Sequence, residues 1–318
     1  MNQLEDTYFT RFRDFLKSTQ TEDSDLKKWQ KAHIFWGKIT SQGLNEIWEA
    51  AIPAELKKGN MDALHAAFFQ STRILLLPSI AGGCDHCTNF WHLLDAAVTE
   101  GTAELRRILP ASLGKASNGH PMPVNGVNLL LCLLHGTEVS FDRETVMNKA
   151  EKFTKTKHPL WDRSVIACLL ALLRRDPEGF SQSLEDVRRS FGRVDCTKYM
   201  RLQCLNGYGL AVLAHDLLPA EDFQRVCLPE GPSFSPAYLQ WRLALPELPK
   251  RLYFTYPDDL DLMNQALARP VRIQRIHQPY AGSENPHLSA KNRREWHLDG
   301  EGMLKELLAE LCEKTDHL

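Results

Sequence analysis

The sequence predicts an all-α protein built from stacked antiparallel helical hairpins, either solenoid-like or an irregular helical bundle. Residues 159–191 lead to this prediction, because two amphipathic stretches follow each other with one tight turn between them. Asp176 offers an N-cap oxygen and Pro177 suits the first helical position, so the second helix is expected to begin there. Apolar residues fall at helical spacing at Trp161, Val165, Cys168, Leu169 and Leu172, and then at Phe180, Leu184, Val187 and Phe191. Neither helix can bury its apolar face alone, so the two are expected to pack together.

Helical patterns cover most of the chain up to residue 245. Apolar spacing predicts helices over residues 4–16, 26–39, 44–54, 61–76, 89–99, 102–109, 142–154 and 198–214. Pro53 is expected to end the third of these helices, and Pro78 the fourth. Residues 127–134 form an apolar run that suits a buried helix or a strand, and its leucines favour a helix. Residues 302–313 predict a further amphipathic helix.

The composition changes along the chain at two places. Residues 110–127 are rich in proline and glycine, which predicts a loop and a candidate hinge. Prolines recur after residue 215, so we expect a helical domain over 1–215 and a proline-rich region over 216–318 packed on it as one continuous fold. In this second region, residues 251–256 are expected to form a short strand or extended segment. Residues 271–276 alternate apolar and basic side chains as a half-exposed strand does, which allows a strand pair in the C-terminal quarter.

Composition and charge favour a cytosolic protein. The 38 Lys and Arg residues nearly balance 40 Asp and Glu residues, so the net charge of −2 gives no general attraction to nucleic acid or to a membrane. The first residues carry Glu5 and Asp6 and no apolar run, so no secretory signal is expected. The longest apolar runs are far shorter than the roughly 20 residues of a membrane span. Eight cysteines in such a chain are expected to be reduced thiols.

One cluster has the residue types of a metal site. Cys84 and Cys87 enclose His86, and His92 follows five residues later. A structural zinc site needs four ligands at defined spacings, and the sequence has no second cysteine pair. We therefore expect no metal and no cofactor, and interpret the two cysteines as thiols packed at the start of a helix. The sequence also lacks the common zinc-protease, hydrolase, dinucleotide and phosphate-loop motifs, so we expect no enzymatic activity.

A stretch of about a quarter of the chain resembles a known family. Its first part is a Trp-containing helix that runs from Trp161 to Asp176, followed by Phe180 and Leu184. Downstream come Cys204-Leu-Asn-Gly-Tyr-Gly-Leu and then Leu228-Pro-Glu before Phe234. Residues 157–234 thereby resemble the immunity proteins of bacterial polymorphic-toxin and type VI secretion systems, specifically immunity protein family 49.

The resemblance implies a non-enzymatic antidote whose partner is a cognate toxin domain, with no direct binding of nucleic acid and no membrane. Toxins of such systems often attack nucleic acids, so an inhibitor commonly places carboxylates where the phosphates of the substrate would lie. Asp258, Asp259 and Asp261 are the local candidates for this mimicry, and Tyr280 and Trp296 are candidate aromatic anchors. These five residues are chosen from composition and spacing alone. The alternative, which the spacing favours over a partner contact, is that Asp258 or Asp259 begins a helix over 260–267 as its cap.

Two other classes of function remain open from the sequence. The first is a helical scaffold or adaptor that binds a peptide or protein partner in a concave groove. The second is an intracellular enzyme whose active site is dispersed along the chain and leaves no local motif. The neighbouring gene distinguishes them, because an antidote is normally encoded beside its toxin.

Overall fold

The structure is a computed structural model, and it describes residues 37, 43–77, 84–256, 258, 261–269, 271–279 and 294–315. Within these residues the chain is mostly helical, with one antiparallel strand pair formed by β1 (Arg275–Pro279) and β2 (Arg294–Leu298). The predicted all-α class with a strand pair in the C-terminal quarter is therefore confirmed. The helix predicted over 4–16 lies outside the described residues, as do residues 26–39 apart from residue 37 and residues 280–293 between the two strands.

The contacts of the chain define two compact units, and both are discontinuous in sequence. Unit 1 combines Met1–Gly82, Pro249–Gln274 and Asp299–Leu318, whereas unit 2 combines Gly83–Leu248 and Arg275–Leu298. The β1–β2 hairpin thus belongs to unit 2, although the chain on both sides of it belongs to unit 1. The division near residue 215 that composition suggests stays a prediction.

In unit 1, α4 (Met61–Leu76) is largely buried and holds the backbone of Tyr253 and Phe254 through one side chain. The amide oxygen of Gln70 accepts hydrogen bonds from the backbone nitrogens of Tyr253 (2.9 Å) and Phe254 (3.0 Å), and its amide nitrogen donates to the carbonyl oxygen of Phe254 (3.1 Å). Residues 251–256 form no strand and the chain bends at Tyr253 and Phe254, so a glutamine side chain pairs with their backbone instead of a neighbouring strand.

The remaining described elements of unit 1 are a short π-helical turn (Ile47–Ala51), α3 (Ile52–Lys58), α14 (Asp261–Ala268) and α15 (Gly300–Thr315). The expectation that Pro53 ends a helix is wrong. Pro53 lies in the first turn of α3, where the backbone nitrogen needs no partner within the helix. The helix predicted over 302–313 is confirmed as part of α15.

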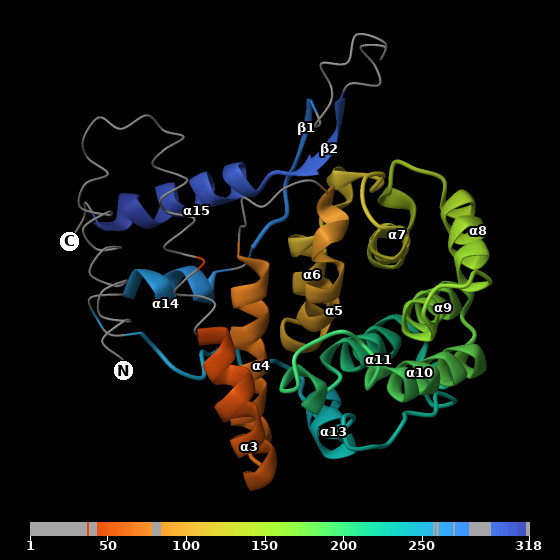
Figure 1. Cartoon of the computed structure of the whole chain (residues 1–318), viewed down its shortest axis with the longest axis horizontal. Helices are drawn as coiled ribbons and strands as arrows, with labels where there is room; N and C mark the ends of the chain where they lie inside the picture. Colours follow the sequence, from red (N-terminus) through yellow and green to blue (C-terminus); the bar gives the residue numbers. More distant parts are fainter. Residues whose placement is uncertain are drawn as a thin grey trace. The chain divides into compact units, whose positions relative to one another are not determined.

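Unit 2 is built mainly from helices (Figure 1). In chain order they are α5 (Phe90–Thr99), α6 (Thr102–Ile108), α7 (Pro121–His135), α8 (Arg143–Thr154), α9 (Leu160–Arg174), α10 (Pro177–Phe191), α11 (Leu205–Leu217), α12 (Ala220–Phe223) and α13 (Pro236–Ala244). The predicted loop over 110–127 is wrong from residue 121 onward, because Pro121 and Pro123 occupy the first turn of α7 instead of preventing a helix. The helix alternative for residues 127–134 is confirmed.

The predicted hairpin is α9 and α10. Arg175 ends α9 in the left-handed conformation (φ 53°), and the side chain of Asp176 accepts a hydrogen bond from the backbone nitrogen of Gly179 (2.9 Å). Trp161 and Leu169 are buried, as the apolar spacing predicts. The ring of Trp161 contacts that of Phe191, with centroids 5.4 Å apart, so the start of α9 lies against the end of α10.

Helices α5 and α11 approach each other closely, and this explains the motif Cys204-Leu-Asn-Gly-Tyr-Gly-Leu. A Cβ atom on Gly209 would lie 2.0 Å from the carbonyl oxygen of Leu94, so only glycine fits there. The side chain of Asn206 donates hydrogen bonds to the carbonyl oxygen of Trp91 (3.0 Å) and to the carboxylate of Asp95 (2.7 Å). The motif therefore positions two helices in the core of unit 2.

Candidate functional site

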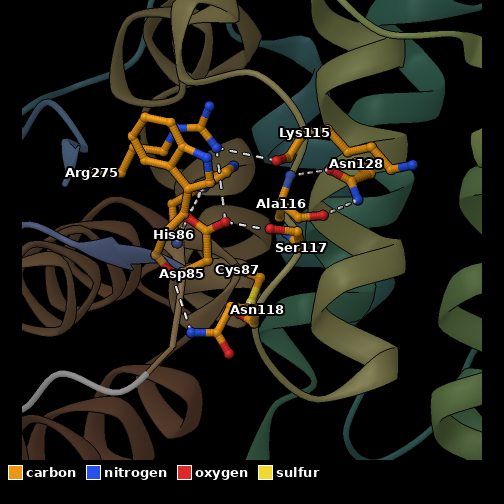
Figure 2. A network of polar contacts seen from close by, with 10 residues as sticks. Asp85, His86, Cys87, Lys115, Ala116, Ser117, Asn118, Asn128 and Arg275 are labelled. Atoms are coloured by element: carbon orange, nitrogen blue, oxygen red, sulfur yellow. Dashed lines mark hydrogen bonds and ion pairs between the residues drawn. The ribbon is translucent and has the colours of Figure 1, made fainter. Parts of the chain in front are cut away.

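The richest cluster of polar groups in unit 2 surrounds Asp85, at the turn that precedes α5 (Figure 2). A 3-10 turn (His86–Asn89) leads into α5, and Asp85 is its N-cap in an extended conformation. One carboxylate oxygen accepts hydrogen bonds from the backbone nitrogen of His86 (2.8 Å) and from the Nδ1 atom of its ring (2.7 Å). The other accepts one from the backbone nitrogen of Ser117 (3.2 Å). Asp85 and His86 are fully buried.

Arg275 at the start of β1 adds a cation to this cluster. Its guanidinium lies 3.8 Å from the carboxylate of Asp85, donates to the carbonyl oxygen of Lys115 (3.1 Å), and covers the ring of Trp296 at 3.9 Å from the centroid. Its side chain is only 14% exposed. The alternation over residues 271–276 predicts basic side chains on the exposed face of a strand, but the guanidinium of Arg275 enters a site with an acceptor, an anion and a ring.

Burial and hydrogen bonding act on Asp85 in opposite directions. Burial by itself raises the pKa of Asp85, but the hydrogen bonds and charge of His86 and the backbone hydrogen bond from Ser117 outweigh it, so the pKa lies below its ordinary value. Burial lowers the pKa of Arg275, and the charge of Asp85 partly restores it. The carboxylate therefore stays ionised at neutral pH.

Asn118 joins this cluster to β2. Its carbonyl oxygen accepts hydrogen bonds from the backbone nitrogen of Asp85 (2.9 Å) and from the thiol of Cys87 (3.2 Å), and its side-chain nitrogen donates to the carbonyl oxygen of Trp296 (3.2 Å). The backbone nitrogen of Leu298 donates to the carbonyl oxygen of Cys84 (2.9 Å). We name Asp85, Asn118, Arg275 and Trp296 the hairpin clamp, because together they fix both strands of the hairpin to the turn before α5.

The reactive side chains beside the clamp are sealed from solvent. Burial raises the pKa of the Cys87 thiol to about 12, so the thiol is neutral at physiological pH and a poor nucleophile. The Nδ1 atom of His86 is bonded to Asp85, while its buried Nε2 atom has no hydrogen-bond partner among the residues that the structure describes. Among the residues that the structure describes, no group of three or more His, Cys, Asp or Glu side chains is arranged to hold a metal ion. The polar groups of this cluster therefore hold backbone segments in position.

An open groove of about 390 Å³ runs along the face of α10 that points away from the core. Its first wall is α10, with Glu178, Ser181, Gln182 and Glu185, and its second is the segment from Arg225 to Pro229. The guanidinium of Arg225 pairs with Glu178 (2.6 Å), and the backbone nitrogen of Cys227 donates to Ser181 (2.9 Å). Leu228 and Pro229 of the family-like stretch therefore line a surface groove.

The structure places three of the five candidate residues chosen from the sequence. Asp258 is exposed, and so is Asp261, the first residue of α14, where its carboxylate accepts hydrogen bonds from Gln265 (2.8 Å) and Asn264 (3.3 Å). Trp296 is half-buried under Arg275 and belongs to the other unit. Asp259 and Tyr280 lie outside the described residues. The role of all five in partner binding stays a prediction.

No pattern in the sequence indicates Asp85, Asn118 and Arg275 as a set. The cysteines make the stretch from Cys84 to Cys87 conspicuous in the sequence, whereas the residue that organises it is Asp85. An acid immediately before a helix is a readable N-cap signal. The partner residues of this acid are distant in the sequence, so no local pattern connects them.

No family model, no curated protein and no solved structure matches this chain. In the part of the chain that the structure describes, none of the helices has the length and apolar character needed to cross a membrane.

Proposed function

We propose that this protein is an immunity protein that binds a cognate secreted toxin domain and neutralises it in the cytoplasm of the producing cell, without catalytic turnover. Residues 157–234, which resemble immunity protein family 49, support this proposal through their role in packing. Trp161, Phe180, Leu184, Tyr208 and Phe234 are all buried in unit 2, and they hold α9, α10 and α11 together as one layer. Such a layer is a rigid base for a binding surface.

The observation that carries the proposal is the hairpin clamp. The clamp buries an ionised carboxylate and a guanidinium, and removing both charges from water has a large free-energy cost. Such a buried pair favours one particular structure over its alternatives more than it raises the overall stability. The side chains with catalytic potential at this place are buried: the ring of His86 is bonded to the carboxylate of Asp85, and the thiol of Cys87 donates to the carbonyl oxygen of Asn118. This use of polar groups suits a protein that must present a fixed surface to a partner.

The mode of inhibition that we propose is occlusion of the toxin's active site. If the toxin acts on nucleic acid, its substrate groove is basic, and carboxylates on the antidote compete with phosphates for it. The exposed Asp258 and Asp261 at the start of α14, with Asp259 between them in the sequence, are the candidates for this contact. No direct contact with nucleic acid is part of the proposal.

Co-expression with the product of the adjacent open reading frame tests the proposed function. Cells that carry the neighbouring gene alone should die, and cells that carry both genes should survive. The two proteins should co-purify at a fixed stoichiometry. A catalytically inactive toxin variant should still co-purify, which separates binding from any chemical modification of the toxin. Survival without a stable complex would contradict the proposal.

A helical adaptor is the second candidate function, and the groove along α10 is the observation that favours it. The helical wall and the segment from Arg225 to Pro229 enclose enough space for part of a peptide, with hydrogen-bonding side chains on α10 and apolar side chains at Leu228 and Pro229. An adaptor should bind its peptide whether or not a toxic neighbour is encoded. A pull-down with a peptide library, followed by mutation of Ser181 and Gln182, distinguishes this function from that of an antidote.

A further inference from the structure

Exposed apolar side chains gather at one end of the layer formed by α9, α10 and α11. Only four large apolar residues are exposed in the described part of the chain, and three of them are Leu160 (41%), Tyr199 (39%) and Leu202 (38%). Leu160 begins α9, and the other two lie three residues apart in the segment before α11. Single exposed apolar residues are ordinary on a protein surface, whereas a group of them marks an interaction site.

Ring contacts and hydrogen bonds place the helix ends next to these residues at one end of the layer. Trp161, next to Leu160, contacts Phe191 at the end of α10. The ring of Trp91 lies 5.9 Å from that of Trp161, and Asn206 in the first turn of α11 donates to the carbonyl oxygen of Trp91 (3.0 Å). The start of α9, the end of α10 and the start of α11 therefore meet around two tryptophans, and residues 192–204 connect α10 to α11 at this place.

The same end carries an excess of positive charge. Residues 157–163 and 192–202 contain five Lys or Arg side chains against two Asp side chains, a net charge of +3 in a chain whose total is −2. Arg193, Lys198 and Arg201 are exposed. In the described part of the chain these three make no ion pair, and Arg201 donates only to the carbonyl oxygen of Val194 (3.1 Å). We name Leu160, Tyr199, Leu202, Arg193, Lys198 and Arg201 the end patch.

We infer that the end patch is a docking surface for an acidic, partly apolar segment on the surface of the toxin domain. This inference rests on the proposed function and adds to it the site and the chemistry of one contact. Cations without an anionic partner attract carboxylates during encounter, and the starts of α9 and α11 add the positive ends of two helix dipoles. The tyrosine and the two leucines then provide apolar area and one aromatic anchor that slow dissociation.

The composition of the end patch favours a protein over a nucleic acid. A nucleic-acid surface pairs cations with phosphates and uses aromatic rings for stacking, but it leaves exposed leucines without a role. Here two of the three apolar residues are leucines, and two aspartates interrupt the cations. An acidic protein segment with apolar side chains matches all of these features.

Three double variants test the inference. The first reverses charge in the end patch (Lys198→Glu with Arg201→Glu), and the second removes apolar area (Tyr199→Ser with Leu202→Ser). The third is a matched control that changes the same net charge elsewhere (Arg106→Glu with Arg175→Glu). Both control residues are exposed and make no ion pair within the described residues, and Arg175 ends α9 at its opposite end. The four mutated side chains of the end patch are all exposed, so every variant should melt within a few degrees of the parent.

The measurement is the kinetics of binding to the purified, catalytically inactive toxin domain encoded beside this gene, at low and at high salt. Charge reversal should slow association at low salt at least tenfold and flatten its salt dependence. Loss of apolar area should raise the dissociation rate at least tenfold, and the control should stay within about twofold of the parent. Parental binding by both end-patch variants would overturn the inference and leave the proposed function intact.

Further outcomes would also overturn the inference. If the parent neither binds the toxin domain nor protects cells, the proposed function fails and the inference fails with it. If the parent binds a short oligonucleotide at physiological salt, and charge reversal abolishes this, the end patch is a nucleic-acid site. If sedimentation shows a dimer that the Tyr199→Ser with Leu202→Ser variant dissociates, the occupant of the end patch is a second copy of the chain.

Discussion

Gly209 of α11 lies so close to Leu94 of α5 that a side chain at position 209 would overlap the leucine's carbonyl oxygen. The neighbour is backbone, so it cannot turn aside as a flexible side chain would. The separation of the two helices is therefore set by the absence of one methyl group. Asn206, one turn earlier, ties the same two helices by hydrogen bonds to Trp91 and Asp95.

The substitution Gly209→Ala is expected to lower the free energy of unfolding by about 3 kcal/mol or more, because the helices must separate to accept the methyl group. Urea denaturation measures this loss. The control is Gly192→Ala, a position with helical φ and ψ and no atom near its built Cβ. That change should be neutral or stabilise by about 0.4–1 kcal/mol. Equal effects at both positions would contradict the close-approach interpretation.

The substitution Trp161→Ala is expected to cost about 3–5 kcal/mol, since it removes a buried ring that contacts Trp91 and Phe191. Binding to the partner should fall only as far as folded protein is lost. Thermal melting and a binding assay on the same preparation separate the two effects. A variant that melts like the parent but loses its partner would identify Trp161 as an interface anchor.

Asp95 should give the protein an unusual dependence of stability on pH. Burial raises the pKa of Asp95 above its ordinary value of 3.8, and the opposing effects of His92 and Asn206 offset it only in part. The folded state thus binds a proton more readily than the unfolded state does. The contribution of Asp95 to stability is full below pH 3.8 and is lost as the pH rises through the raised pKa of the folded state.

The variant Asp95→Asn isolates this effect, because an amide oxygen can still accept the hydrogen bond from Asn206. The free energy of unfolding of the variant minus that of the parent should increase from pH 4 to pH 7. Chemical denaturation of both proteins across this range measures the two free energies of unfolding. Taking their difference cancels the pH dependence that the variant and the parent share. A difference that stays constant with pH would show that Asp95 has an ordinary pKa in the folded protein.

The substitution Arg275→Met should loosen the hairpin clamp. Met keeps much of the apolar stem but removes the cation, so the buried carboxylate of Asp85 loses its partner charge at a cost of about 2–3 kcal/mol. Hydrogen exchange should become faster at the backbone amide of Leu298, which is bonded to Cys84. Exchange within α9 and α10 should stay slow. Unchanged exchange at Leu298 would mean that the backbone bonds hold the hairpin without Arg275.

Reversal of Asp258, Asp259 and Asp261 to Lys tests the proposed mimicry of phosphate. Association with a nucleic-acid-targeting toxin should become slower and less dependent on salt, because long-range attraction is lost. Stability should change little, since exposed like charges gain little from one another. If the triple variant still protects cells and associates at the parental rate, these carboxylates serve only the start of α14.

Local patterns predicted most helices correctly, and they failed where one residue type is compatible with either the end or the start of a helix. The α9–α10 pair follows from apolar spacing, the cap at Asp176 and Pro177, all of which lie within about 30 residues. The sequence predicts helix breaks at Pro53 and at the prolines of residues 110–127. In the structure, Pro53, Pro121 and Pro123 each occupy the first turn of a helix. Proline stops a helix or begins one depending on the chain before it, and the sequence signal is the same in both cases.

The candidate site was less predictable than the fold. Asp85 and Arg275 are far apart in the sequence and meet only because the chain returns to unit 2 after passing through unit 1 over Pro249–Gln274, and no local periodicity indicates such a contact. The exposed Tyr199 and Leu202 are at helical spacing and were assigned to a helix over 198–214, whereas α11 begins at Leu205. Apolar residues at helical spacing indicate that their side chains would share one face of a helix. The spacing does not show whether another part of the protein packs against that face.

The discontinuity of unit 2 has a consequence for how the protein is made. Asn118 and its hydrogen-bond partner Trp296 are 178 residues apart in the chain. During synthesis, the turn before α5 must wait until the chain as far as β2 has been made before β2 can cover it. A contact of such long range forms late and limits the folding rate. Until then, the carboxylate of Asp85 lacks its guanidinium, and a nascent chain released early would expose this unfinished surface to chaperones and proteases.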